Sequence, residues 1–160
     1  MTQAEHILGY LQSNASRGVG YQAADMVLRA HRDASYIWTE NDLRCRTGRF
    51  IFFRNSDPNF INGHVEVIST VHKNNVTCTA EAEYVAVFDV AQRLAYVRKS
   101  AGALGYPQGV AVLEGGNECV LNLANVMAHE RKLRRVAMRF HRARDQVRLG
   151  STDVVWRKDT

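Results

Sequence analysis

Arginine and lysine side chains crowd one stretch near the C-terminal end of the chain. Residues 130–148 hold eight of them against two acidic residues, a net charge of +6, whereas the remainder carries a net charge of −1. Drawn as a helix, the stretch places Arg131, Arg135, Arg139 and Arg142 on one side, opposite an apolar side. Guanidinium groups bind phosphate oxygens through paired hydrogen bonds. The stretch therefore predicts salt-dependent, largely sequence-independent nucleic-acid binding, with a solvated surface or an acidic protein partner as the alternative.

Neither the cysteines nor the histidines have the spacing of a metal site. Cys45, Cys78 and Cys119 form no C-x-x-C pair, and their odd number argues against a disulfide framework. Cys119 begins a predicted helix, but nothing near it in the sequence supplies the base that a thiol nucleophile needs. These observations predict an intracellular, reducing compartment and leave nucleus, cytoplasm and organelle open.

The composition is that of an ordinary globular domain. The chain has 160 residues, of which 46% are hydrophobic and 23% charged, and a net charge of +5. This length buries enough surface for one core without disulfides or a structural metal. No apolar run approaches the roughly 20 residues that cross a bilayer, so we expect no membrane partner.

Hydrophobic patterns predict the elements that must position any site. The strands are expected at Met26–Ala34, Arg49–Arg54, His64–Thr70, Gly109–Leu113 and Thr152–Trp156. The helices are expected at Ala4–Leu11, from Thr79 to Gly102, and at Asn117–Met127 and Glu130–Arg148. Three leading antiparallel strands followed by alternating helices and strands predict an α/β fold, a mixed five-stranded sheet flanked by helices. We expect residues 1–22 to form a helix and connector, and residues 23–160 the domain.

The octet Thr79–Ala86, with the sequence TAEAEYVA, resembles the start of the first helix in the ribonuclease H (RNase H) domain of copia-type LTR retrotransposon Pol polyproteins. Other segments are similar in the same order along nearly the whole chain. Residues 33–36 resemble the first catalytic strand, residues 46–53 the second strand, and residues 141–147 the third helix. The resemblance implies an RNase H-like fold, which matches the predicted element order, and implies that the final helix of the family is lacking here.

The family resemblance implies hydrolysis of the RNA strand of an RNA–DNA hybrid by two Mg²⁺ ions held by four carboxylates. Asp33 and Glu83 match the first two acids and are the candidate catalytic and metal-binding residues. Where the family has its third acid, directly before an asparagine, this chain has Gly116. The fourth acid should follow the last strand, but the sequence stops at Thr160. We therefore expect a degenerate site that binds Mg²⁺ only if the carboxylates suffice.

Two neighbouring acids could replace the third carboxylate, although both are displaced. Glu114 lies two residues before Gly116 on a strand, a shift of roughly 6.6 Å, and Glu118 falls in the following helix. Mg²⁺ demands near-octahedral geometry, so either shift is large.

The third helix also departs from the family pattern. Arg134 and Arg135 stand in a motif that normally contains a Lys-His pair and an acid, which raises the positive charge. The candidate nucleic-acid-binding residues are therefore Arg131, Arg134, Arg135, Arg139 and Arg142.

Three functions are consistent with the sequence. The first is a degenerate retrotransposon-derived RNase H-like domain, catalytically impaired, that binds RNA, RNA–DNA hybrid or other nucleic acid through its basic helix. The second is a weak two-metal hybrid ribonuclease. The third is a structural subunit recruited into a larger nucleoprotein or protein assembly.

Overall fold

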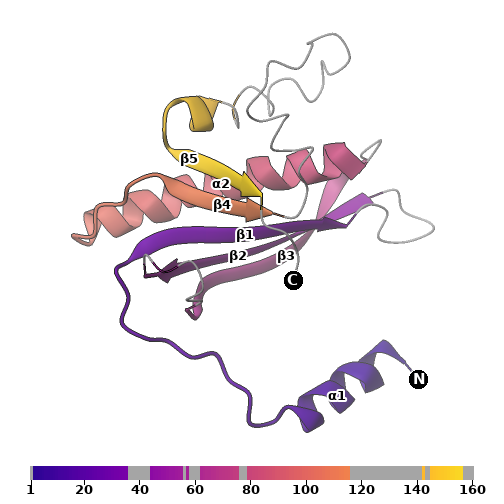
Figure 1. The fold of residues 1–160 in the computed structure, drawn as a ribbon. Helices are drawn as coiled ribbons and strands as arrows, with labels where there is room; N and C mark the ends of the chain where they lie inside the picture. Colours follow the sequence, from indigo (N-terminus) through magenta and orange to yellow (C-terminus); the bar gives the residue numbers. More distant parts are fainter. Residues whose placement is uncertain are drawn as a thin grey trace.

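The computed structural model describes residues 2–35, 44–55, 57, 62–75, 79–115, 142 and 145–156. They form a five-stranded sheet with a long helix against one face (Figure 1). The strands are β1 (Val27–Ser35), β2 (Arg44–Arg54), β3 (His64–Asn75), β4 (Ala111–Gly115) and β5 (Thr152–Trp156). The helices are α1 (Gln3–Ser13) and α2 (Thr79–Ala103).

The sheet is mixed, as the sequence predicts, and its strand order is β3-β2-β1-β4-β5. Strands β1, β2 and β3 are antiparallel neighbours, whereas β4 and β5 run parallel to β1. The register pairs Arg32 with Gly115 and His31 with Glu114 across β1 and β4. Residues from distant parts of the sequence therefore meet at the end of β1.

Helix α2 covers one face of the sheet because its apolar residues recur at helical spacing. Tyr84, Val87, Val90 and Leu94 are buried there. They pack against sheet residues that point the same way: Leu28, Ala30, Ile51, Leu113 and Val154. A smaller cluster of Cys45, Ala82 and Val85 lies at the N-terminal end of the helix.

Helix α1 lies apart from the sheet, at the end of an extended connector (Figure 1). Thr2 and Glu5 cap its N-terminus in a reciprocal capping box. None of its residues is buried, and Ile7, Leu8 and Leu11 are all exposed. No helix in the described part of the chain is long and apolar enough to span a bilayer.

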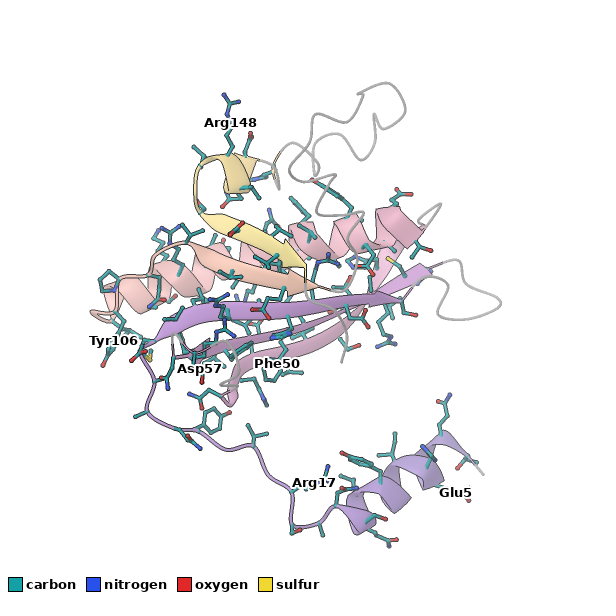
Figure 2. All side chains as sticks on the ribbon, viewed as in Figure 1. Glu5, Arg17, Phe50, Asp57, Tyr106 and Arg148 are labelled. Carbon is teal, nitrogen blue, oxygen red and sulfur yellow. The ribbon has the colours of Figure 1, made fainter. Side chains whose placement is uncertain are left out.

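The connector is fastened to the sheet close to β1. The Tyr21 hydroxyl donates to the His64 carbonyl oxygen at 2.9 Å, and the Gln22 amide donates to Asn62 Oδ1 at 2.9 Å. The Asp25 amide donates to Asn55 Oδ1 at 3.0 Å. These polar side chains are drawn with all the others in Figure 2. The three hydrogen bonds hold the C-terminal part of the connector against the sheet.

The predicted elements that fall within the described residues are confirmed with shifted ends. Strand β2 begins five residues before the predicted Arg49, and β3 continues five residues beyond the predicted Thr70. Strand β4 is shifted by two residues toward the C-terminus, whereas β5 lies where predicted. The helix expected at Asn117–Met127 and most of the helix expected at Glu130–Arg148 fall outside the described residues, although residues 145–148 are helical.

Candidate functional site

Arg32 and Glu83 form a buried ion pair between β1 and α2. Arg32 points to the helix-covered face, and its Nη1 donates to Glu83 Oε2. The two residues are 6% and 8% exposed. Glu83 is therefore not an open carboxylate at the surface, because a guanidinium already holds it.

Burial raises the pKa of Glu83 above its ordinary value, and the nearby Arg32 guanidinium opposes this shift. Burial also lowers the pKa of Arg32, with Glu83 and Asp33 acting in the opposite direction. Each charge is poorly hydrated, so each depends on its partner. Losing either side chain would leave the other one buried and unpaired.

Asp33 lies next to Arg32 near the end of β1 and is exposed. Its charge contributes to raising the pKa of Glu83. Asp33 and Glu83 therefore interact electrostatically. Side chains alternate along β1, so Asp33 points away from α2, whereas Arg32 points toward it and holds Glu83.

Gly115 provides the space that Arg32 occupies. A Cβ atom at Gly115 would lie 2.8 Å from Arg32 Cζ and 2.9 Å from Arg32 Nε. Because Arg32 and Gly115 are partners in the parallel β1–β4 register, this closeness is fixed by the sheet. The glycine thus permits the guanidinium to lie against the backbone of β4.

Glu114 is 5% exposed and lies on the other face of the sheet. Its carboxylate is 3.4 Å from Arg29 Nη1, 3.3 Å from His31 Nε2 and 3.7 Å from Arg54 Nη2. Side chains alternate along β1, so Arg29 and His31 point away from α2, whereas Arg32 points toward it. The structure therefore separates Glu114 from Glu83, and Glu118 lies outside the described residues.

The described residues do not fit a two-metal centre. They hold no group of three or more His, Cys, Asp and Glu side chains placed to bind a metal ion. Asp33 and Glu83 supply two carboxylates, and the Arg32 guanidinium is hydrogen-bonded to one of them. A cation bound to Glu83 would meet that fixed positive charge. Gly116, at the third acidic position of the family, lies outside the described residues.

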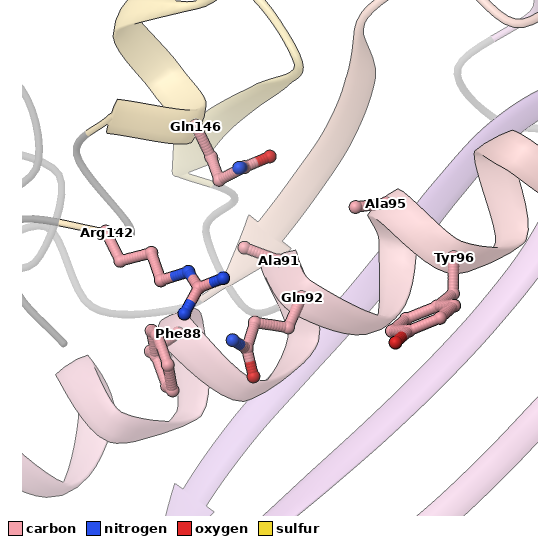
Figure 3. A pocket seen from close by; sticks show the side chains of 7 residues that line it. All are labelled: Phe88, Ala91, Gln92, Ala95, Tyr96, Arg142 and Gln146. Atoms are coloured by element: carbon pink, nitrogen blue, oxygen red, sulfur yellow. The ribbon is translucent and has the colours of Figure 1, made fainter.

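Arg142 is exposed and lies beside α2, where its guanidinium reaches over Phe88 (Figure 3). The other predicted nucleic-acid-binding residues, Arg131, Arg134, Arg135 and Arg139, fall outside the described residues. Arg142 therefore places one candidate phosphate-binding side chain beside α2.

Sequence reasoning did not identify Arg32 as a functional residue. The sequence offered one signal, an arginine directly before the candidate Asp33. Its importance depends on the β1–β4 register and on the contact with Glu83, which is 51 positions away. No spacing rule predicts that contact.

No protein-family model matches the sequence, and no curated protein matches it. Solved RNase H structures do match the fold. LC11-RNase H1, isolated from compost by a metagenomic approach, aligns with a TM-score of 0.57 and 12% identity over 82% of this chain and 84% of that one. Its complex with an RNA/DNA hybrid aligns with a TM-score of 0.56 and 13% identity over 82% and 85%.

A viral domain aligns over a slightly larger share of the chain. The PFV RNase H domain aligns with a TM-score of 0.51 and 11% identity over 87% of this chain and 81% of that one. The mixed five-stranded sheet with three leading antiparallel strands agrees with the sheet predicted from the sequence. The chain has the RNase H-like fold.

Proposed function

We propose that this chain is a degenerate, copia-type retrotransposon RNase H-like domain that binds nucleic acid and hydrolyses it poorly. The observation that supports impaired hydrolysis is the Arg32–Glu83 ion pair. The guanidinium neutralises the carboxylate that the family resemblance assigns to metal binding. A divalent cation would have to compete with the buried Arg32 guanidinium for this carboxylate.

Nucleic acid is the proposed partner, with RNA–DNA hybrid as the first candidate. The net charge of +6 between residues 130 and 148 supports phosphate binding. Arg142, the member of the candidate set within the described residues, is exposed beside α2. A solved protein of the same fold was crystallised with an RNA/DNA hybrid.

Fluorescence anisotropy with a labelled RNA–DNA hybrid tests the binding. The affinity should fall steeply with salt, and Arg142→Gln should lower the logarithmic salt slope by about one unit. Lys99→Gln is the matched control, because Lys99 is exposed on α2 and lies outside the pocket beside Arg142. Affinity that does not change with salt, or an absence of binding at low salt, would overturn the proposal.

Weak two-metal cleavage of hybrids is the second candidate, favoured by the electrostatic coupling of Asp33 and Glu83. It requires a third carboxylate, and Glu114 is held by cationic side chains on the opposite face. Titration with Mg²⁺ and Mn²⁺ by calorimetry separates the candidates. Two binding sites would favour the ribonuclease, and no binding at millimolar metal would eliminate it.

A structural role is the third candidate, and the apolar side chains of α1 favour it. Ile7, Leu8 and Leu11 are each more than half exposed. A helix with such a surface is suited to an assembly interface. A stoichiometric complex recovered from cells, together with no binding of free RNA, would favour this role over nucleic-acid binding.

A further inference from the structure

A pocket of about 250 Å³ lies between α2 and the helical turn at residues 145–148 (Figure 3). Its floor is helix α2, where the buried Ala91 and the exposed Ala95 lie between the larger lining side chains. Phe88 and Tyr96 supply aromatic rings at its two ends. Small alanine side chains and two aromatic rings therefore line the pocket along the helix.

Three polar side chains border this apolar floor. Gln92 extends from α2, while Arg142 and Gln146 reach over the helix from the opposite side (Figure 3). Within the part of the chain that the structure describes, no hydrogen bond or ion pair involves these three side chains. None of the described lining residues is acidic. One permanent positive charge and two amides are thus available to a ligand.

This combination matches the groups of a nucleotide. A guanidinium binds a phosphate through two parallel hydrogen bonds. A glutamine amide both donates and accepts, so it can pair with the edge of a base. Aromatic rings bind the face of any base. A simple carboxylate would use Arg142 and leave the rings and amides without a role.

We propose that this pocket binds a single unpaired nucleotide, with the phosphate at Arg142 and the base against the exposed part of α2 at Ala95 and Tyr96. Its volume lies just below the roughly 300–1,000 Å³ of typical ligand pockets, which suits one nucleotide and excludes a duplex. One source of this nucleotide is the single-stranded end of a bound nucleic acid. For that source, the inference rests on the proposed function. A free nucleotide carries the same chemistry and is the other source.

Two measurements on the full chain test the proposal and distinguish the sources. In the first, anisotropy compares a blunt RNA–DNA hybrid with the same hybrid carrying a single-stranded overhang. The overhang should tighten binding at least about fivefold, the gain expected from stacking one base. In the second, AMP and UMP at millimolar concentration are titrated into isotopically labelled protein, and the NMR signals of Ala91 and Ala95 should shift.

Single substitutions test whether the nucleotide binds in this pocket. Gln92→Ala, at an exposed helical position where alanine is well tolerated, should reduce the overhang gain and leave blunt-hybrid affinity unchanged. Arg142→Gln should remove the nucleotide shifts, whereas the control Lys99→Gln should keep them. Loss of the overhang gain in the control as well would place binding elsewhere and overturn the proposal.

Failure of the pocket is distinguishable from failure of the proposed function. If blunt and overhang hybrids bind equally well and AMP and UMP shift no NMR signals, the pocket proposal is overturned while the proposed hybrid binding stands. Nucleotide shifts without hybrid binding support the pocket and overturn nucleic-acid binding. Equal shifts with succinate, which has carboxylates and no base, overturn the nucleotide assignment.

Discussion

Arg32 sets the chemistry of the site because its guanidinium holds the carboxylate of Glu83 in a buried ion pair. Removing one member of such a pair is costly, since the other charge stays buried without its partner. The neighbouring Asp33 is exposed, so it does not replace Glu83 as the buried partner of Arg32. The site is thus organised around an internal cation.

Arg32→Met tests this pairing at the level of stability. Methionine retains much of the apolar stem but removes the charge that compensates Glu83. The free energy of unfolding, measured by urea titration, should fall by about 3–5 kcal/mol. Arg17→Met, in the exposed connector, is the control and should change stability by no more than about 0.5 kcal/mol. A loss at Arg32 as small as the control would contradict the buried pair.

Gly115→Ala tests the space beside the guanidinium. The new Cβ would lie 2.8 Å from Arg32 Cζ, so either Arg32 or β4 has to move. We expect a loss of about 1–3 kcal/mol in urea unfolding. Gly109→Ala, two residues before β4 begins at Ala111, meets no atom within 4 Å and serves as control. Equal stability of the two variants would show that Arg32 does not occupy this space.

The pH dependence of stability tests the environment of Glu83. Burial raises its pKa above the ordinary value of 4.5, so the folded protein binds this proton more tightly than the unfolded chain. The resulting stability is complete below the ordinary pKa and is lost as the pH rises through the raised pKa.

Glu83→Gln cannot titrate, and it therefore isolates this contribution. The free energy of unfolding of the unsubstituted chain minus that of Glu83→Gln should decrease as the pH rises from about 4.5 through the raised pKa, in urea titrations at a series of pH values. A difference that increases over the same range would mean that the ion pair lowers the pKa of Glu83.

The family resemblance made Asp33 and Glu83 the candidate site residues, because each stands in a segment that resembles a family motif. It did not identify the guanidinium between β1 and α2. That contact requires the sheet register, which pairs Arg32 with Gly115 across 83 positions of sequence. The partners of Glu114 were missed for the same reason, since Arg54 reaches it from β2.

At the scale of elements, the strongly periodic segments were predictable and the polar ends of strands were not. Helix α2 and strand β5 agree with their hydrophobic patterns. Strand β2 starts early because Cys45 and Thr47 alternate into the interior, although neither is a large apolar residue. Pairing with β2 extends β3 as far as Asn75, beyond its apolar residues. Tertiary contacts, rather than local pattern, fix these ends.

Helix α1 should contribute little to the stability of the sheet, because none of its residues is buried. A chain lacking residues 2–17 retains Tyr21 and Gln22, which fasten the connector. Its free energy of unfolding should lie within about 0.5 kcal/mol of that of the full chain. Leu94→Ala, in the core of α2, provides the contrast and should cost about 2–5 kcal/mol. A large loss on deleting α1 would reveal packing that this structure does not show.

At the scale of the whole molecule, the RNase H-like fold is combined with an uneven charge distribution. The fold matches solved RNase H structures at 11–13% identity, so the arrangement of strands, rather than shared sequence, carries the likeness. The excess positive charge lies between residues 130 and 148, and Arg142 brings part of it to α2. In the proposed function, this charge binds phosphate while Arg32 neutralises Glu83, so the chain binds nucleic acid and hydrolyses it poorly.

Cleavage of a labelled RNA–DNA hybrid tests this conclusion most directly. The purified full chain, at concentrations that saturate the hybrid, is incubated with Mg²⁺ and separately with Mn²⁺, alongside Asp33→Asn. We predict that the hybrid is bound and stays uncut by both proteins. Metal-dependent cleavage that disappears in Asp33→Asn would contradict the impaired site and establish a working ribonuclease.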